Sequence, residues 1–456
     1  MILQENIAAI STPPGVGGVA IVRISGEDPL SVLSKMFRPA GKVPVADFDP
    51  YRLYPGVIEA EGFSDFGMAV FFRSPKSYTG ENMVEIHCHG GVAIARGVLE
   101  KTFSLGCRPA SRGEFSKRAF LNGKMSLSSS EGLIDMIHAE SRAGAAVGYE
   151  LYREKLYGAV ENLRRELTFA LAEIDAEIDY PEEGLEEKSD AEIREKLTSV
   201  AERLQKLAAT FKTGSRLKNG VRVAIVGRPN TGKSSLLNAL IGREKAIVTE
   251  IAGTTRDVVE GETELGGVRF LFSDTAGIRE SEDKVEKIGV SISKKLAENC
   301  DLALFVTDSG DFDEETAALF SSRIKAGEKA WIVLNKSDLS GTKAHEKAVA
   351  EKYGEPLVLS CKTGDGVEKL REKLEEFALS GAADPEAGYL TEERHYAIVQ
   401  ETGKLLFSAA AEVGNVPCDL LAADVTEAWQ KLGEITGSTA PEEVINEIFD
   451  KFCVGK

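Results

Sequence analysis

The segment from residue 221 to residue 240 constrains the fold of this chain more than any other. An apolar run, Val221–Val226, is followed by Gly227-Arg228-Pro229-Asn230-Thr231-Gly232-Lys233-Ser234, which has the pattern GxxxxGKS, and then by a helical pattern over 235–240. In such a loop the glycines let backbone N–H groups surround phosphate oxygens, the lysine reaches the outer phosphates, and the serine ligates Mg²⁺. The sequence therefore predicts a nucleotide-binding α/β domain.

Further apolar strands alternate with helical patterns downstream of this loop. The predicted strands are Arg269–Phe272, Leu302–Val306, Trp331–Leu334 and Leu357–Leu359, and the alternation closes near Leu379. This order is typical of a doubly wound, mostly parallel sheet, in which ligands bind beyond the carboxyl ends of the strands.

Four more short motifs follow the phosphate-binding loop, and together they predict a GTPase. Thr255, in Gly253-Thr254-Thr255-Arg256-Asp257, is placed to complete a Mg²⁺ shell, and Asp274-Thr275-Ala276-Gly277 follows a predicted strand. In Asn335-Lys336-Ser337-Asp338 the final carboxylate can accept hydrogen bonds from guanine N1–H and N2–H₂, and Ser360-Cys361-Lys362 is a base-supporting loop. The predicted Mg²⁺ ligands are Ser234 and Thr255. The predicted GTP-binding residues are Asn230, Thr231, Gly232, Lys233, Ser234, Ser235, Thr249, Glu250, Ile251, Ala252, Gly253, Thr254, Thr255, Asp274, Thr275, Ala276, Gly277, Asn335, Lys336, Asp338, Ser360, Cys361 and Lys362.

The residue after the DTAG glycine bears on the mechanism of hydrolysis. Small signalling GTPases have a glutamine there that orients the attacking water, whereas this chain has Ile278. The charged segment that follows offers Arg279 as a cation and Glu280, Glu282, Asp283 and Glu286 as carboxylates. The composition of this segment does not indicate which of these side chains acts in hydrolysis.

The rest of the chain falls into a β-rich region and two helical regions. Residues 1–120 are rich in Gly, Pro and β-branched residues, with strand-like runs at Val19–Ile24 and Met68–Phe72, which predicts an α+β domain. From about Met125, apolar residues recur at spacings of three and four and predict helices that pack as a bundle. These stripes are Leu163, Leu167, Ala170 and Ile174, and Ile193, Leu197, Val200, Leu204, Leu207 and Phe211, the second capped at Ser189 or Asp190.

Helical periodicity returns after residue 380, so we expect a nucleotide-binding domain inserted into a discontinuous helical domain. The predicted boundaries are 1–120 for the N-terminal domain, 121–216 and 381–456 for the two parts of the helical domain, and 217–380 for the G domain. The fold class is multidomain α/β.

Charge and cysteine content exclude several classes of protein. The formal net charge is −18, yet residues 1–124 carry 14 Lys and Arg against 12 Asp and Glu. A strongly basic nucleic-acid binder is therefore excluded as a description of the whole chain, although a local basic patch is allowed. The sequence shows no secretory signal, no apolar run long enough to span a bilayer and no disulfide framework among its 6 cysteines, so we expect a cytoplasmic protein.

Beyond the G motifs, the chain resembles one family over essentially its whole length: the tRNA wobble-uridine modification GTPases of the MnmE (TrmE) family. The marks outside the G motifs are Thr12-Pro13-Pro14-Gly15, Gly17-Gly18-Val19, Ser77-Tyr78-Thr79-Gly80-Glu81, His89-Gly90-Gly91, the run 108–124, and Phe452-Cys453-Val454-Gly455-Lys456. The resemblance implies an N-terminal domain that binds tetrahydrofolate and forms a homodimer, with Arg23, Glu85, Lys124 and Lys456 at the folate.

The same resemblance implies a role for potassium in hydrolysis. Asn230, Thr249, Ile251 and Thr254 match the family's K⁺ site, where the ion acts in place of an arginine finger. Glu286 matches the carboxylate that orients the hydrolytic water, and Cys453 matches a cysteine proposed to act in the modification. The implied activity is C5 (carboxymethyl)aminomethyl modification of wobble uridine U34 in tRNA, carried out with a flavin-dependent MnmG/GidA-type partner. A 5-formyl- or 5,10-methylene-tetrahydrofolate would supply the one-carbon unit.

Alternatives remain open at three places. Glu85, His87 and His89 alternate along a strand, so they share a face that is suited either to a metal or to the N–H donors of a pterin ring. The run Arg108–Lys124, with five basic residues and one acidic residue, is either solvated surface or a contact for folate glutamate or tRNA phosphate. A ribosome-assembly RNA-binding GTPase is the alternative function, and a membrane-remodelling GTPase is a more distant one.

Overall fold

The computed structural model describes residues 5–60, 62–179, 186–242, 261–274, 300–381, 384 and 387–456. The chain divides into two compact units, the first made of residues 1–134, 150–201 and 401–456, and the second of residues 135–149 and 202–400. Residues 150–201 and 401–456 belong to one unit although the nucleotide-binding strands lie between them in the sequence. The prediction that the G domain is inserted into a discontinuous helical domain is therefore confirmed.

A seven-stranded sheet with the order β3-β4-β5-β6-β2-β1-β7 forms the N-terminal part of the first unit. All its neighbouring strands run antiparallel except β1 and β7, which are parallel. The predicted strands at 19–24 and 68–72 are present and longer than expected. The elements are β1 (Ile7–Ile10), β2 (Val19–Gly26), α1 (Pro29–Ser34), β3 (Phe37–Pro39), η1 (Val45–Asp47), β4 (Leu53–Glu59), β5 (Ser64–Phe72), β6 (Asn82–His89), α2 (Val92–Ser104), β7 (Arg108–Pro109) and α3 (Glu114–Leu121).

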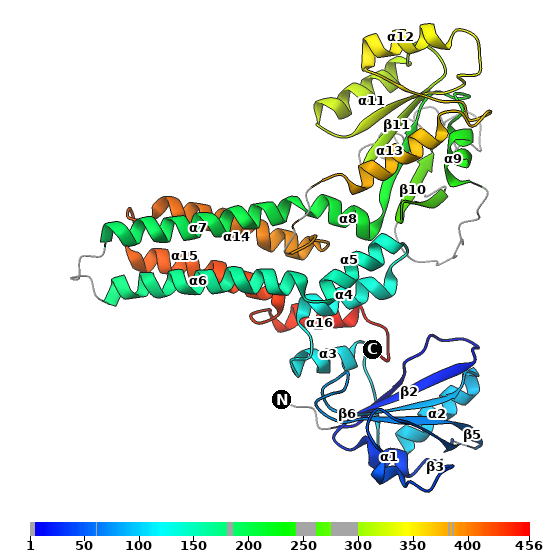
Figure 1. Cartoon of the computed structure of the whole chain (residues 1–456), viewed down its shortest axis with the longest axis vertical. Coiled ribbons are helices and arrows are strands. Elements are labelled where there is room, and N and C mark those ends of the chain that lie inside the picture. The colour runs from blue at the N-terminus through cyan, green and yellow to red at the C-terminus, as the bar shows by residue number, and fades with distance from the viewer. Residues whose placement is uncertain are drawn as a thin grey trace, which may run out of the picture. The chain divides into compact units, whose positions relative to one another are not determined.

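The two faces of this sheet differ, because successive side chains of a strand point to opposite sides. Val22 and Ile86 belong to the face that packs with α1 and α2 into one apolar core (Figure 1). Arg23 and Glu85 lie directly across from each other on the opposite face. At one end of that face Phe115 of α3 packs against strand β1, whereas the other end exposes the apolar side chains Val19, Leu53, Phe66 and Met68.

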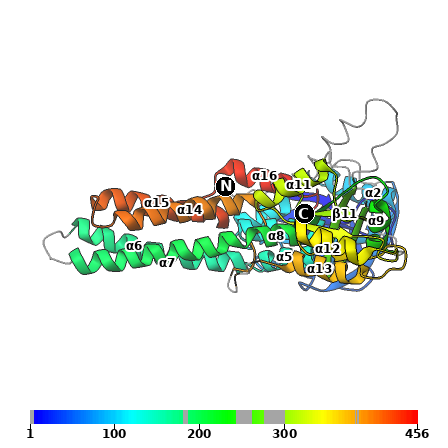
Figure 2. The ribbon, with the colours of Figure 1, turned by 90° about the horizontal axis from the view of Figure 1, so that it is seen from above.

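The helices of the first unit bury the stripes that the spacing predicted. Leu163, Leu167, Ala170 and Ile174 are buried on α6, which packs along α15 (Figures 1 and 2). The expected cap at Ser189 or Asp190 is wrong, because α7 already begins at Glu186, and Phe211 belongs to the following helix. The elements are α4 (Leu127–His138), α5 (Arg142–Tyr152), α6 (Lys155–Asp179), α7 (Glu186–Ala209), α14 (Glu393–Glu412), α15 (Cys418–Thr436) and α16 (Glu442–Asp450); α4, α5, α7 and α14 continue into the second unit.

The second unit contains a six-stranded sheet with the order β13-β12-β11-β8-β10-β9. All its strands are parallel except β9, which pairs antiparallel with β10, so the predicted mostly parallel sheet is confirmed. Helices α8, α9 and α13 pack on one face, and α11 and α12 pack on the other. The elements are α8 (Phe211–Asn219), β8 (Val221–Val226), α9 (Lys233–Ile241), β9 (Gly261–Leu265), β10 (Val268–Asp274), β11 (Leu302–Thr307), α11 (Glu314–Lys325), β12 (Ala330–Leu334), α12 (Thr342–Tyr353), β13 (Leu357–Val358) and α13 (Val367–Leu379).

The start of α5 holds the hairpin that joins β9 to β10. The Ala143 N–H donates to the Gly267 carbonyl at 2.9 Å, and Arg142 Nε donates to Glu264 Oε1 at 2.7 Å. Because this hairpin lies between the GTTRD and DTAG motifs in the sequence, the segment 135–149 contacts the G domain at the connection between them.

No helix among the described residues is both long and apolar enough to cross a membrane.

Candidate functional site

The phosphate-binding loop leads from β8 into α9 as the sequence predicted. Gly232 has the left-handed φ of 94° immediately before the first helical residue, Lys233. The Lys233 side chain is buried, and its Nζ donates to the carbonyl oxygens of Gly227 and Arg228 at 2.9 Å each. The loop therefore curves around the amino group that would meet a nucleotide phosphate.

The glycines of this loop are required by close approach of neighbouring atoms. A Cβ on Gly232 would lie 2.2 Å from Asn335 Nδ2, and one on Gly227 would lie 2.2 Å from the Val306 carbonyl oxygen. Both distances are far shorter than van der Waals contact. Any residue other than glycine at either position would therefore change the shape of the loop.

The NKSD motif is bonded directly to the phosphate-binding loop. Asn335 Nδ2 donates to the Thr231 carbonyl at 2.9 Å, and Asn335 Oδ1 accepts from the Cys361 N–H at 3.1 Å. Lys336 Nζ donates to the Asn230 carbonyl at 2.7 Å. Asn335 thus joins the phosphate-binding loop to the base-supporting loop at the carboxyl ends of the strands. Lys336 adds a second bond to the phosphate-binding loop.

The Asp338 carboxylate lies beside these two loops and is partly exposed. Ser360 Oγ donates to Asp338 Oδ1 at 2.7 Å, and Lys362 Nζ lies 4.0 Å from Oδ2. The hydrogen bond from Ser360 and the nearby positive charges lower the pKa of the Asp338 carboxyl, so it is ionised at neutral pH. An ionised carboxylate in this position can accept two N–H donors of guanine.

Several predicted residues lie outside the described residues: Thr249, Glu250, Ile251, Ala252, Gly253, Thr254, Thr255, Thr275, Ala276, Gly277 and Glu286. Asp274 ends β10, and its side chain is likewise outside the description. Ser234 and Ser235 are exposed in the first turn of α9, and Asn230 is exposed in the loop with a left-handed φ of 65°. The described part of the predicted site therefore assembles at one edge of the sheet.

A second polar site lies on the open face of the N-terminal sheet, around Arg23 and Glu85. Arg23 Nε and Nη2 donate to Glu85 Oε1 at 3.0 and 2.8 Å, and the Arg23 guanidinium carbon lies 5.3 Å from the centre of the Tyr78 ring and 5.6 Å from that of Phe115. Burial acts to raise the pKa of Glu85, but the contact with His87 and the charge of Arg23 outweigh it and lower that pKa. The pair is thus ionised and partly shielded from water.

The two histidines of the same strand have different environments. His87 Nε2 is buried with no hydrogen-bond partner among the described residues, and it lies 3.5 Å from Glu85 Oε2. The exposed His89 contacts Asp65 through Nδ1 at 2.6 Å. In the described part of the chain, no group of three or more His, Cys, Asp or Glu side chains is arranged to hold a metal ion. Glu85 Oε2 and His87 Nε2 instead form a polar pair with hydrogen-bonding capacity left for a ligand.

The CVGK segment (Cys453–Lys456) lies beside this pair. The Gly455 carbonyl accepts hydrogen bonds from Arg23 Nη1 at 3.2 Å and Ser11 Oγ at 3.1 Å. Cys453 is an exposed thiol. Lys124 is exposed, and its side-chain carbons lie beside Gly80 in the loop that carries Tyr78. Of the predicted folate residues, Arg23 and Glu85 contact each other directly, and Gly455, the residue before Lys456, contacts Arg23.

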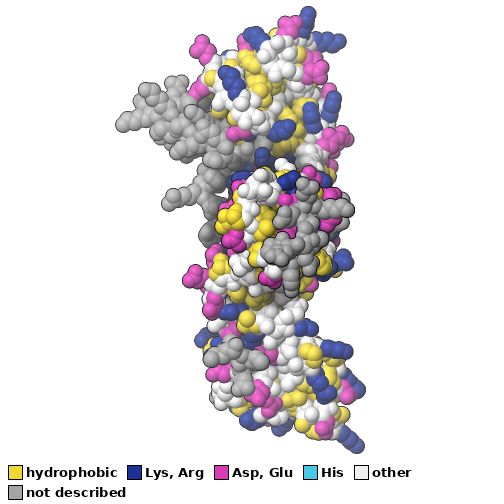
Figure 3. Space-filling model, turned by 90° about the vertical axis from the view of Figure 1, so that its left-hand side faces the viewer, with side chains coloured by type: hydrophobic (Ala, Val, Ile, Leu, Met, Phe, Trp, Pro, Cys, Tyr) yellow, Lys and Arg dark blue, Asp and Glu magenta, His cyan; other side chains and the backbone are white. Residues whose placement is uncertain are grey.

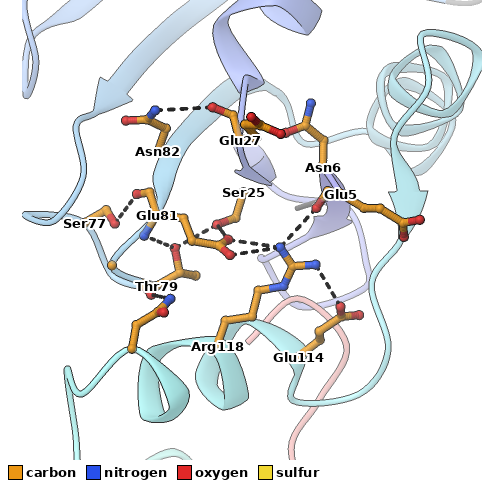
Figure 4. Close-up of polar contacts among 12 residues, drawn as sticks. Glu5, Asn6, Ser25, Glu27, Ser77, Thr79, Glu81, Asn82, Glu114 and Arg118 are labelled. Carbon is orange, nitrogen blue, oxygen red and sulfur yellow. Dashed lines mark hydrogen bonds and ion pairs between the residues drawn. The ribbon is translucent and has the colours of Figure 1, made fainter. Parts of the chain in front are cut away.

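At Arg118, the last arginine of the basic run 108–124, the side chain is neither solvated surface nor a phosphate contact, so both interpretations are wrong there. Arg118 is 2% exposed, and its Nη1 donates to both carboxylate oxygens of Glu81 and to the Glu5 carbonyl, while Nη2 donates to Glu114 (Figure 4). Arg108 also pairs with Glu114. The signal for this in the sequence is Glu114 itself, the acid of the run, which lies four residues before Arg118 on one helix face.

On one face of the molecule, charged side chains of both signs are interspersed (Figure 3). On the face drawn in Figure 3, the coloured Lys and Arg side chains alternate with Asp and Glu. The described residues on that face show no continuous basic patch of the kind a nucleic-acid duplex needs.

A mostly parallel sheet with a lysine-bearing phosphate loop and, at its strand ends, an ionised carboxylate able to accept guanine N–H donors defines a P-loop GTPase. Two family models match this chain: one described as the MnmE helical domain matches residues 127–453, and one described as the GTP-binding protein TrmE N-terminus matches residues 6–124. The tRNA modification GTPase MnmE of Natranaerobius thermophilus is 38% identical over 99% of this chain and 100% of that protein. Those of Christiangramia forsetii and Streptococcus thermophilus are 37% and 39% identical, over 100% and 99% of this chain and 100% and 98% of theirs. The chain belongs to the MnmE family of tRNA modification GTPases, and it hydrolyses GTP.

Proposed function

We propose that this chain is a potassium-dependent GTPase that modifies C5 of wobble uridine U34 in tRNA together with a flavin-dependent partner of the MnmG/GidA type. A reduced folate would donate the one-carbon unit. One observation carries the proposal furthest: the Gly455 carbonyl of the CVGK segment accepts a hydrogen bond from Arg23, which in turn pairs with Glu85, although the segment and these two residues lie near opposite ends of the sequence. The proposed domain boundaries are 1–120, 121–216, 217–380 and 381–456.

For the nucleotide, the proposal assigns the base to Asn335, Lys336 and Asp338, and the phosphates to Lys233 and the loop before it. Ser234 and Thr255 would hold Mg²⁺. Asn230, Thr249, Ile251 and Thr254 would hold K⁺, whose charge would stabilise the phosphoryl oxygens during hydrolysis. In support, Asn230 is exposed in the loop, and its amide oxygen is a ligand suited to a hard cation. Glu286 would orient the hydrolytic water.

For the folate, the proposal assigns Glu85 and Arg23, with Lys124 and Lys456 toward the acidic end of the ligand. His87 Nε2, which is buried with no hydrogen-bond partner in the part of the chain that the structure describes, and the adjacent Glu85 Oε2 are suited to the N–H and carbonyl groups of a pterin ring. The rings of Tyr78 and Phe115 beside Arg23 supply an apolar wall. Bound folate would supply the one-carbon unit, and Cys453 would act in the modification.

A homodimer is proposed through the N-terminal domain. The exposed apolar side chains of Val19, Leu53, Phe66 and Met68 on one sheet face support this, because such a face is usually covered by another surface. The mixed charge on the face drawn in Figure 3 is consistent with a flavin-dependent partner that supplies much of the binding to tRNA.

The potassium part is tested by measuring GTP turnover in KCl and in NaCl at equal ionic strength. We expect hydrolysis to be at least ten-fold faster in potassium, and equal rates would overturn this part. Glu286→Gln should lower turnover in potassium while leaving nucleotide binding intact, which separates water orientation from binding.

The folate part is tested by calorimetric titration with 5-formyl-tetrahydrofolate. Arg23→Ala and Glu85→Gln should each weaken binding by ten-fold or more, because each removes a charged partner. Arg96→Ala, at an exposed arginine on α2, is the matched control and should bind as the unaltered chain does. Unchanged binding by both site variants would overturn the assignment.

The tRNA part is tested by mass spectrometry of wobble uridine from cells that lack this protein, complemented with the unaltered chain or with Cys453→Ser. We expect modification to depend on the protein and to be lost in the cysteine variant. Co-sedimentation with ribosomal subunits, without any effect on wobble uridine, would favour the ribosome-assembly alternative.

A further inference from the structure

The CVGK segment is held on the N-terminal domain almost entirely through its main chain. Arg112 and Val454 form an antiparallel bridge, and Arg112 Nε donates to the Phe452 carbonyl at 3.1 Å. Ser11 Oγ donates to the Gly455 carbonyl at 3.1 Å. A Cβ on Gly455 would lie 2.2 Å from the Ile10 carbonyl oxygen, so the segment lies against the end of β1 at backbone distance. These contacts position the main chain and leave the Cys453 thiol exposed.

We call the contacts of Ser11, Arg112 and Arg23 with this segment its seat. Arg23 belongs to the seat and also pairs with Glu85. Its Nε and Nη2 donate to Glu85 Oε1, while Nη1 donates to the Gly455 carbonyl at 3.2 Å. The guanidinium is planar, so its orientation toward the carboxylate also sets its orientation toward the carbonyl. The Arg23 side chain is only 17% exposed, which limits the other conformations it can adopt.

A ligand would affect these contacts by binding Glu85 Oε2, the carboxylate oxygen to which Arg23 does not donate. Oε1 accepts both bonds from Arg23, whereas Oε2 lies 3.5 Å from His87 Nε2, which is longer than a good hydrogen bond. A ligand donor that binds Oε2 therefore need not displace Arg23. It would instead immobilise the carboxylate, and with it the arginine that holds Gly455.

We propose that Ser11 and Arg112 are positioning residues that seat the CVGK segment, and that Arg23 couples this seat to the ligand of Glu85. The inference rests on the proposed folate site and adds a property to it: folate binding and seating of the segment stabilise each other. By linkage, seating of the segment raises folate affinity by the same factor by which bound folate raises the equilibrium constant for seating. The segment that carries Cys453 is then ordered when the one-carbon donor is present.

Hydrogen exchange of the full chain, read by mass spectrometry with and without 5-formyl-tetrahydrofolate, tests the coupling. Peptides covering 449–456 should exchange at least three-fold more slowly with saturating ligand. Ser11→Ala should speed exchange of these peptides without ligand and weaken folate binding about five-fold, the effect of one hydrogen bond. Ser11→Thr keeps a hydroxyl and should restore both properties.

Ser34→Ala is the matched control, because Ser34 Oγ also donates to a main-chain carbonyl of the N-terminal domain, that of Ser31 at 2.8 Å, away from the seat. It should change neither exchange at 449–456 nor folate affinity. Folate binding without slower exchange would overturn the coupling, and unliganded Ser11→Ala exchange equal to that of the unaltered chain would overturn the role of Ser11. A chain that binds no folate would overturn the proposed folate site and the coupling, while the seat would still be judged from the unliganded exchange.

Discussion

Nη1 of Arg23 lies 3.2 Å from the carbonyl oxygen of Gly455, although 432 residues separate the two along the chain. The contact joins strand β2 of the N-terminal sheet to the segment that follows α16. It also places a glycine where a side chain has no room, because the backbone of Ile10 is directly opposite. The motif CxGK therefore has a structural explanation for its glycine that is independent of any chemistry at the cysteine.

Gly455→Ala should unseat the CVGK segment. Gly455 has a left-handed φ of 99°, and the added Cβ would lie 2.2 Å from the Ile10 carbonyl oxygen. Backbone strain of about 1–3 kcal/mol or displacement of the segment must result. Hydrogen exchange of peptides covering 449–456 should become several-fold faster. Gly41→Ala is the control, since a Cβ there meets nothing within 4 Å, and an effect as large as that at Gly455 would contradict the explanation.

Arg118→Met should destabilise the N-terminal domain by about 3–5 kcal/mol, because it leaves the carboxylates of Glu81 and Glu114 without their buried partner. Urea unfolding of the full chain, followed by circular dichroism, should show an earlier transition. Arg96→Met removes an exposed pair on α2 and should cost at most about 0.5 kcal/mol. Equal effects of the two variants would show that the Arg118 network contributes little.

The strands and motifs of the G domain could be predicted from the sequence, because their signals are local. Val221–Val226 is a continuous apolar run, and β8 has those same bounds. Asn335 and Asp338 follow directly on a buried strand, and the edge at which parallel strands end brings such residues together. The stripe on α6 was predictable for a similar reason, since helical periodicity identifies the buried side.

The buried state of Arg118 and the seat of the CVGK segment could not be predicted in this way. Both depend on residues far apart in the sequence, such as Arg118 with Glu81 and Arg23 with Gly455, and no periodicity joins them. A count of charges treats every arginine as exposed, so the run 108–124 suggested a solvated or anion-binding surface. Glu114 lies four residues before Arg118 on the same helix, but only the fold shows that the distant Glu81 joins it in neutralising Arg118.

Asp338→Asn should weaken GTP binding by about 10–100-fold, because an ionised acceptor of two guanine N–H groups is replaced by an amide. The amide offers a donor instead, so xanthine nucleotides should gain relative to guanine nucleotides. Competition binding with GTP and XTP measures both effects. Asp365→Asn, at an exposed aspartate of the neighbouring loop, is the control and should leave the preference unchanged. An unaltered preference in Asp338→Asn would contradict the assignment of base recognition.

A partly buried cluster of three titratable groups in the second unit makes stability depend on pH. Lys218 Nζ lies 2.7 Å from Asp135 Oδ1 and also contacts Glu392. Burial and the negative charge of Glu392 raise the pKa of Asp135 from 3.8 to about 7, despite the lysine. One cation thus faces two carboxylates, and the more buried carboxylate retains its proton.

This raised pKa predicts a loss of stability as pH rises. The folded chain keeps a proton on Asp135 at pH values where the unfolded chain has released it, so its contribution to the free energy of unfolding falls between about pH 4 and pH 7. Asp135→Asn mimics the protonated form and should remove this dependence. Urea titrations at pH 8 should show the variant to be more stable than the unaltered chain by about 1–3 kcal/mol, and titrations at pH 5 should show little difference. Asp47→Asn, at an exposed aspartate, should have no such effect. A variant that is less stable at pH 8 would mean that the ion pair with Lys218 outweighs both burial and the repulsion from Glu392.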